Sequence, residues 1–307
     1  MPPRSPLPQR QGLDAAWLRT PDNDPDAPPR WATMRDFLVD RLPAVVPVGE
    51  MLAAGEFVDQ AGRPWTWEEP YRPNAFVWFH RPLAPEPVVP FPVEVLDADA
   101  RVVVVDKPHF LATTPRGTHV RESVLVRLRD SLGLPDLAPA HRLDRLTAGV
   151  LMLTVQRGHR AAYAGLFQTR RVHKTYEALA PFDPTLEFPR RVTSRIEKPR
   201  GSLQAEVVAG EPNAETLVEL VETRGQLARY RLTPTTGKTH QLRVHMAALG
   251  LPILGDPLYP TVLDVDPDDF TAPLQLIARR LCFTDPIDQT LRDYTSRFAL
   301  AWPGAAR

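Results

Sequence analysis

Hydrophobic positions along the chain follow two periods, one typical of strands and one of helices. Val102 to Val105 and Ala148 to Val155 are continuous apolar runs, which predict buried strands. Apolar residues spaced three or four apart predict helices over residues 121–132 and 159–168. A further strand is expected over residues 172–180. The part of the chain after residue 100 therefore has the pattern of a packed globular domain.

A hairpin and another helix are expected further on. Thr216 to Glu222 and Leu227 to Leu232 are strand-like segments around Arg224-Gly225. A helix should run from about Thr239 to Leu249, with Thr239 as its N-cap and Gly250 as its stop. Because strands and helices mix without regular βαβ alternation, the pattern predicts an α+β fold.

The first third of the chain has a different composition, with 18 of the 35 prolines. Residues 1–30 combine eight prolines with few apolar side chains, so an extended or disordered segment is expected. Residues 31–81 are expected to form a small accessory segment that begins with a short helix over residues 32–42. Residues 82–92 hold five prolines and predict a semi-rigid linker, which leaves residues 93–303 as the main domain.

The net charge is informative only when it is counted separately for each third of the chain. The 37 basic and 37 acidic residues cancel, which by itself argues against a strongly basic nucleic-acid binder. Residues 1–100 are net −6, residues 101–200 are net +9 and residues 201–307 are net −3. The middle third therefore suits a polyanionic partner.

Several classes of protein are disfavoured by what the sequence lacks. Cys282 is the one cysteine, so neither an intrachain disulfide nor a multi-cysteine zinc site can form, and a reducing, cytoplasmic location is expected. Arg4 and Arg10 are not followed by an apolar run, so no signal peptide is expected. No stretch approaches about 18 apolar residues, so no membrane span is expected either. A monomer is the default expectation.

The densest polar cluster is His141-Arg142-Leu143-Asp144-Arg145, directly before a buried strand. Nearby cations lower the pKa of a carboxylate, so Asp144 could serve as a nucleophile or a base. The flanking arginines could bind phosphates through two hydrogen bonds each. An ordinary structural ion-pair loop is the alternative.

A second cluster begins at Gly237-Lys238-Thr239. It is not a P-loop, because the pattern needs a glycine five positions before Gly237, where Leu232 stands. The segment is then a turn that leads into a helix, and the first backbone amides of a helix favour anions. His240 and Arg243 are three residues apart and should lie on one face of that helix. A solvated polar face would look the same.

The third cluster lies in the strand expected over residues 172–180. Lys174 and Tyr176 are two apart and should point to the same side. Tyr176 could stack on a base or transfer a proton, or it could simply pack with its hydroxyl at the rim.

Taken in order, these clusters form a longer signature. It reads His-Arg-Leu-Asp-Arg-x-Thr-x-Gly from His141, Lys-x-Tyr-x-Ala from Lys174, and Gly-x-Thr-His-Gln-x-Arg-x-His-Met from Gly237. Gly255-Asp256-Pro-Leu-Tyr259 and the segment from Leu274 to Phe283 follow. Over about residues 93–300 the chain resembles the RluA-type family of RNA pseudouridine synthases.

The resemblance implies a pseudouridine synthase fold, with a mainly antiparallel central sheet, flanking helices and a cleft. It implies that Asp144 starts the isomerisation of uridine, that Tyr176 stacks on the target base and helps proton removal at C5, and that Arg243 pairs with Asp144. The implied substrate-binding residues are His141, Arg142, Arg145, Lys174, His240, Gln241 and Leu242. The sequence departs from the usual family pattern at Leu146, Ala148, Leu242 and Ile277, none of which removes a catalytic group.

The resemblance also implies partners. The substrate would be ribosomal or transfer RNA, and neither a cofactor nor a metal is required. Residues 31–81 echo the order of an S4-like RNA-binding module, although this acidic third lacks the usual basic helical face.

Two other functions stay open on sequence grounds. One is a catalytically silent RNA-binding protein or RNA chaperone on the same scaffold. The other is a metallohydrolase using His141, His240 and His245 with Asp144. The five-residue spacing of His240 and His245 places them on different sides of a helix and disfavours it.

Overall fold

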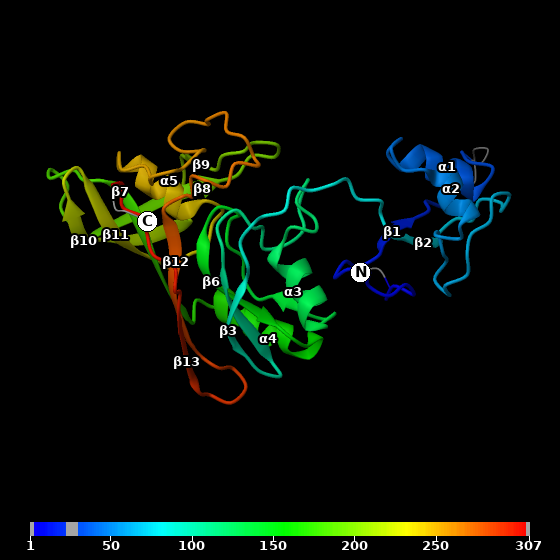
Figure 1. Ribbon diagram of the computed structural model, residues 1–307, viewed down its shortest axis with the longest axis horizontal. Helices are drawn as coiled ribbons and strands as arrows, with labels where there is room; N and C mark the ends of the chain where they lie inside the picture. Colours follow the sequence, from blue (N-terminus) through cyan, green and yellow to red (C-terminus); the bar gives the residue numbers. More distant parts are fainter. Residues whose placement is uncertain (1–2, 23–29, 305–307) are drawn as a thin grey trace. The chain divides into compact units, whose positions relative to one another are not determined.

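The chain folds into two compact units, residues 1–85 and residues 86–307 (Figure 1). A computed structural model describes residues 3–22 and 30–304. Each unit has its own hydrophobic core and is therefore a separate structural body. No helix among the described residues is both long enough and apolar enough to cross a membrane.

Unit 2 is built on one sheet of eleven strands (Figure 1). The main path runs in the order β3 (Glu94–Ala98), β4 (Val102–Lys107), β6 (Ala148–Thr154), β12 (Leu276–Thr284), β7 (Val172–Pro181), β11 (Leu227–Pro234), β10 (Ala214–Arg224), β8 (Arg190–Glu197) and β9 (Glu206–Val208). β5 (Ala138–Pro139) pairs with β6, and β13 (Leu291–Thr295) pairs with β12. Only β6 and β12 pair in parallel among these strands. The α+β prediction is confirmed.

Helices cover both faces of this sheet. They are α3 (Val124–Leu132), α4 (Arg160–Gln168, after the 3₁₀ turn η1, Arg157–His159) and α5 (Gln241–Ala248). Side chains alternate along a strand, so Val103 and Val105 of β4 pack with α3 while Val102 and Val104 pack with α4. Burial on both faces explains why β4 is a continuous apolar run. The strands and helices predicted between residues 100 and 235 are present.

The start of helix α5 differs from the prediction. The helix begins at Gln241, and its N-cap is His240 in the left-handed region at φ 56°, without a side-chain cap, so Thr239 is not the N-cap. The side-chain oxygen of Gln241 instead accepts hydrogen bonds from the Lys238 amide at 3.0 Å and the Thr236 hydroxyl at 2.7 Å. The side chain of Gln241, at the first position of the helix, therefore holds this turn, where the prediction assumed an N-cap side chain.

Unit 1 is a two-stranded sheet packed on two short helices. Its elements are β1 (Ala16–Arg19), α1 (Met34–Arg41), α2 (Val48–Ala53) and β2 (Phe76–Phe79). β1 pairs antiparallel with β2 although 56 residues separate them, and it lies within the segment expected to be extended or disordered. Helix α1 confirms the helix predicted over residues 32–42, and Thr33 and Asp36 form its capping box.

The proline-rich segment 82–92 spans the boundary between the units. The carboxylate of Glu86 accepts hydrogen bonds from the amides of Val120, Arg121 and Glu122 at 2.9–3.1 Å. Val89 is buried in the core around α3. The second half of the segment therefore belongs to unit 2, which its proline content does not reveal.

Candidate active site

A cleft of about 1810 Å³ opens in unit 2 and contains all three predicted clusters. Eight Arg and Lys side chains line it, against three acidic ones. The basic residues are Arg116, Arg142, Arg145, Arg170, Lys174, Lys198, Lys238 and Arg243, and the acidic residues are Asp144, Glu215 and Asp264. The zero net charge of the chain thus conceals a basic cleft.

Asp144 lies in this cleft on the loop between β5 and β6, with its side chain 33 % exposed. Thr113 holds the loop, because its hydroxyl donates to the Leu143 carbonyl at 2.8 Å and accepts from the Leu143 amide at 3.1 Å. His109 Nδ1 lies 2.7 Å from the Leu146 carbonyl. The backbone on both sides of Asp144 is therefore fixed.

Lys107 supports the same loop from the protein interior. It is fully buried, and its Nζ donates to the carbonyls of Pro108 and Leu111 at 2.8 Å and of Arg145 at 3.1 Å. Burial lowers the pKa of Lys107 to about 7, and the nearby Asp144 opposes that shift. Three carbonyl acceptors match the three N–H groups of an ammonium, so they too favour the charged form.

Gly149 brings the strand after Asp144 close to its neighbour. Its φ is 115°, and a Cβ there would lie 2.3 Å from the Ala278 carbonyl oxygen on β12. The glycine of the first motif is thus required by the close approach of β6 and β12 rather than by contact with a substrate.

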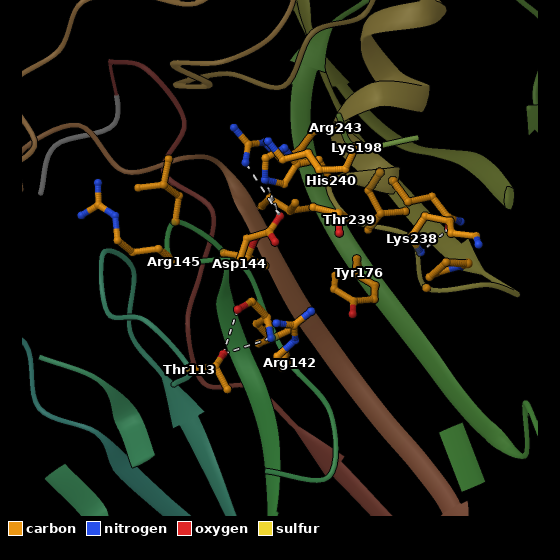
Figure 2. A pocket seen from close by; sticks show the side chains of 18 of the residues that line it. Thr113, Arg142, Asp144, Arg145, Tyr176, Lys198, Lys238, Thr239, His240 and Arg243 are labelled. Atoms are coloured by element: carbon orange, nitrogen blue, oxygen red, sulfur yellow. Dashed lines mark hydrogen bonds and ion pairs between the residues drawn. The ribbon is translucent and has the colours of Figure 1, made fainter. Parts of the chain in front are cut away.

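Arg243 enters the cleft from helix α5. Its guanidinium makes two hydrogen bonds with Asp256, at 2.7 and 2.6 Å, and lies 3.8 Å from the Asp144 carboxylate. Figure 2 shows Arg243 and His240 directed toward Asp144; His240 Nε2 is 4.0 Å from that carboxylate. The implied pairing of Asp144 with Arg243 is therefore a loose contact, and the tight partner of Arg243 is Asp256.

Tyr259 connects these groups. Its ring lies under the Arg243 guanidinium, 5.2 Å from centroid to Cζ. Its hydroxyl accepts from the Ala205 amide at 2.7 Å, donates to the Ala205 carbonyl at 3.0 Å and lies 2.9 Å from His240 Nδ1. Since the one hydrogen of the hydroxyl is donated to the Ala205 carbonyl, we assign the donor role in this contact to His240 Nδ1.

Tyr176 lies across the cleft from Asp144 (Figure 2). It is half-buried on β7, opposite Leu232 and Ala278 of the adjacent strands. Burial first, and the charge of Asp144 second, raise the pKa of Tyr176 well above its ordinary value, so the hydroxyl stays protonated at neutral pH. Lys174 also lines the cleft, and burial lowers the pKa of its ammonium.

Three of the predicted substrate-binding residues have internal partners. His141 Nε2 accepts the Met152 amide at 3.1 Å, its ring stacks on Phe167 at 4.4 Å, and burial lowers its pKa to about 3. The amide of Gln241 donates to the Glu215 carbonyl at 2.9 Å. Leu242 is buried in the core under α5. These three residues border the cleft and also hold it in shape.

The two arginines beside Asp144 differ from each other. Arg142 is exposed at the cleft. Figure 2 shows the guanidinium of Arg145 directed away from Asp144, and its Nη1 is 3.5 Å from the Phe110 carbonyl. The cations beside Asp144 in sequence are therefore not the cations nearest to it in space.

Sequence reasoning missed several residues of the site. Three of them lie outside the sequence motifs: Thr113, Lys107 and Lys198. Two others, Asp256 and Tyr259, lie within the motif Gly255 to Tyr259, but that motif predicted no role for either. The sequence signal that could have pointed to Lys198 and Lys107 is the rarity of lysine, since the chain has only four lysines beside 33 arginines. Three of the four line the cleft and the fourth supports it.

The imidazoles of the metallohydrolase alternative are occupied elsewhere. His245 lies between the hydroxyls of Thr216 and Ser194, at 2.9 Å from each, and His141 accepts the Met152 amide. Within residues 3–22 and 30–304, no group of three His, Cys, Asp or Glu side chains is placed to hold a metal ion. The arrangement does not support that alternative.

Comparisons with known proteins agree with the geometry. A model of the family described as RNA pseudouridylate synthase matches residues 101–248. The dual-specificity RNA pseudouridine synthase RluA of Vibrio cholerae is 33 % identical over 214 residues, covering 65 % of this chain and 80 % of that protein. The mitochondrial tRNA pseudouridine(32) synthase of Saccharomyces cerevisiae is 31 % identical, covering 56 % of this chain and 38 % of that protein.

The structural comparison gives the same fold. The structure of human RNA pseudouridylate synthase domain containing 1 superposes with a TM-score of 0.55 at 23 % identity, covering 67 % of this chain and 84 % of that one. Fold and relatives together define an RNA pseudouridine synthase, an isomerase that acts on RNA. Within that class, the chain belongs to the RluA-type family. The family model lies wholly in unit 2, and the S4-like interpretation of residues 31–81 stays a prediction.

Proposed function

We propose that this enzyme isomerises a uridine in an unpaired loop of ribosomal or transfer RNA, and that Asp144 starts the reaction. The observation that carries the proposal is the placement of Asp144. It is a partly exposed carboxylate on a rigid loop, with Arg243 and His240 on one side and Tyr176 across the cleft. A carboxylate so held is suited to act on a sugar carbon or a sugar proton.

The chemistry is an isomerisation, so atoms balance within one nucleotide. The N1–C1′ bond breaks, the uracil turns, C5 bonds to C1′, C5 loses its proton and N1 gains one. Asp144 either attacks C1′, with uracil leaving as the anion, or removes a sugar proton to give a glycal. Both routes use the carboxylate of Asp144, and the guanidinium of Arg243 lies 3.8 Å from it.

Tyr176 has a separate proposed role. Its raised pKa keeps the phenol protonated, so it is suited to stack on the detached uracil and to donate a hydrogen bond, not to act as a phenolate base. Stacking would retain the uracil while it turns.

The remaining cleft cations would bind the RNA backbone. A base cannot turn within a helix, so the nucleotide must be flipped out, at a cost of a few kcal/mol. Phosphate contacts from Arg142, Lys174, Lys198 and Lys238 would offset that cost. RNA binding should therefore weaken as salt rises, since each phosphate contact releases counterions.

The names of two relatives bear on the class of RNA substrate. One relative is named dual-specificity, and another is named for a tRNA uridine, which supports ribosomal or transfer RNA as the substrate class.

The single cysteine supports a cytoplasmic, reducing location. The cleft is formed by unit 2 of one chain, so a monomer would suffice for catalysis.

The proposal is tested with bulk RNA containing 5-tritiated uridine, because reattachment through C5 releases the tritium. Asp144→Asn should abolish release while RNA binding persists. Asp264→Asn, a change of another acidic cleft residue, should retain it. Wild-type release from Asp144→Asn would refute the assigned role. Mapping the pseudouridines that disappear on deletion of the gene would identify the substrate.

A further inference from the structure

Two side chains of the cleft, His240 and Asp144, face each other without touching. Nε2 of His240 and Oδ2 of Asp144 lie 4.0 Å apart, and Figure 2 shows the imidazole directed toward the carboxylate. That distance is too long for a hydrogen bond between the two atoms. Two polar atoms this far apart are both within reach of a third polar group placed beside them.

The imidazole of His240 is held in one orientation by Tyr259. Nδ1 lies 2.9 Å from the Tyr259 hydroxyl, whose one hydrogen is donated to the Ala205 carbonyl, so Nδ1 carries the hydrogen of this contact. The two rings also meet edge to face, with their centroids 5.7 Å apart. His240 holds the left-handed conformation at φ 56°, which is uncommon for a residue other than glycine and persists where the surrounding structure fixes it. The position of Nε2 is therefore set by the fold.

Nε2 is a hydrogen-bond acceptor when the imidazole is neutral. Burial lowers the pKa of His240 below its ordinary value, and the charge of Asp144 opposes that shift without reversing it. A neutral imidazole has one N–H group, which is at Nδ1, so Nε2 presents a lone pair. The carboxylate of Asp144 also presents acceptors. Because two acceptors face each other, a donor from the substrate suits this position, whereas a further acceptor does not.

One group on the sugar of an RNA chain meets that requirement. In the proposed reaction Asp144 attacks C1′ or removes a proton from the neighbouring C2′, so both carbons come close to His240. The 2′-hydroxyl is bonded to C2′ and donates a hydrogen bond, whereas O3′ and O5′ are esterified to phosphates. The uracil N3–H is also a donor, but the proposed stack places the base at Tyr176, across the cleft. Because Asp144 is engaged with the sugar carbon or its proton, Nε2 is the acceptor left for the hydroxyl.

We propose that Nε2 of His240 accepts a hydrogen bond from the ribose 2′-hydroxyl of the target nucleotide, which makes this histidine the residue that distinguishes RNA from DNA in the cleft. The inference rests on the proposed role of Asp144, because that role places the sugar beside His240. The His240 side chain is 12 % exposed, so an acceptor there loses more than a surface group does when its donor is missing. A deoxyribose at this position would leave the lone pair of Nε2 without that partner.

The test compares two forms of one RNA on the full chain. The probe is a fluorescent stem-loop copied from a uridine site that the mapping identifies. It carries pseudouridine at that site, which is the product of the reaction, so it is not turned over. The second form carries 2′-deoxypseudouridine there. Wild type should bind the second form about tenfold more weakly, as expected for loss of one hydrogen bond to a partly buried acceptor.

His240→Asn removes the acceptor and keeps the backbone. Asparagine adopts the left-handed conformation readily, but its side chain is too short to reach the position of Nε2. This variant should bind the two RNA forms with affinities within about twofold of each other. The matched control is His173→Asn, which changes another histidine of the same cleft, on β7, and should keep the wild-type preference.

A second variant tests the orientation of the imidazole. Tyr259→Phe leaves His240 in place but removes the hydroxyl that accepts from Nδ1, so the hydrogen is no longer fixed there and the preference should fall. Thermal unfolding establishes which variants are folded. Should His240→Asn not fold, Tyr259→Phe decides the question.

The outcomes separate this proposal from the role of Asp144. Equal binding of the two RNA forms by wild type, or a wild-type preference in folded His240→Asn, would overturn it. Equal weakening of both forms in that variant would mean that His240 only shapes the cleft, and would overturn it too. If Asp144→Asn loses tritium release while the preference persists without His240, only this proposal fails. If Asp144→Asn keeps tritium release, the role of Asp144 fails, and a preference that depends on His240 still supports the contact with the 2′-hydroxyl.

Discussion

At the scale of single residues, the position of Arg243 depends on Asp256. Both side chains are almost completely buried, and their two short hydrogen bonds hold the guanidinium 3.8 Å from Asp144. Asp256 also accepts the amides of Leu258 and Tyr259. One carboxylate therefore orders the cation, the tyrosine ring beneath it and the connecting turn.

Asp256→Asn should lower the free energy of unfolding by about 3 kcal/mol, because removing one member of a buried ion pair leaves the other uncompensated. It should also reduce kcat by a larger factor than it changes KM, because Arg243 would lose its orientation toward Asp144. Urea unfolding and tritium release measure the two effects. Asp293→Asn is the control: it breaks the exposed pair with Arg280 and should cost less than about 1 kcal/mol. Equal losses in both variants would contradict the assignment.

At the scale of elements, the parallel contact of β6 and β12 sets the geometry of the cleft floor. Ala148 pairs with Ile277 and Gly149 with Ala278, in the middle of an otherwise antiparallel sheet. The loop that carries Asp144 ends where this contact begins. Close approach of the two strands therefore places Asp144 near Tyr176, whose strand pairs with the other edge of β12.

Gly149→Ala should destabilise unit 2 severely, because the new methyl group would overlap the Ala278 carbonyl and the residue would hold a φ of 115°. Separation of β6 from β12 should also reduce tritium release. Gly158→Ala is the control, since no atom lies within 4 Å of the position that its methyl group would take and its φ is not in the left-handed region. Thermal unfolding of the two variants gives the comparison, and a Gly149→Ala chain as stable as the control would disprove the steric argument.

At the scale of the whole molecule, charge is distributed unevenly. The cleft of unit 2 is basic although the chain is neutral overall. Ionic pairs such as Arg101 with Asp288 and Arg292 with Asp99 keep much of the remaining charge of unit 2 internally balanced. Buried histidines add a dependence on pH that net charge does not reveal. Burial lowers the pKa of His141 to about 3 and of His109 and His245 to about 4.

Stability of unit 2 should fall as the pH drops from about 6.5 toward 4. The folded chain keeps these imidazoles neutral while the unfolded chain protonates them, so the unfolded state takes up more protons in that window. Each histidine can contribute up to about 1.4 kcal/mol per pH unit there. Urea unfolding at pH 7 and pH 5 measures the slope. His245→Gln should reduce it, whereas changing the exposed His173 to Gln should not. A slope unaffected by His245→Gln would contradict the prediction.

The sequence alone determined the elements of unit 2 and the chemistry of its motifs. Apolar runs such as Val102–Val105 and the order of the Asp144, Tyr176 and Arg243 motifs depend on local spacing, which a sequence displays directly. The tertiary structure decided which groups meet. It paired Arg243 with Asp256, turned Arg145 away from Asp144 and bonded His141 to the Met152 amide. It also placed Lys107 beneath the loop and joined β1 to β2 in unit 1. These contacts depend on which segments, far apart in sequence, pack together in the fold. Neither the periodicity nor the composition of the sequence shows which segments will meet.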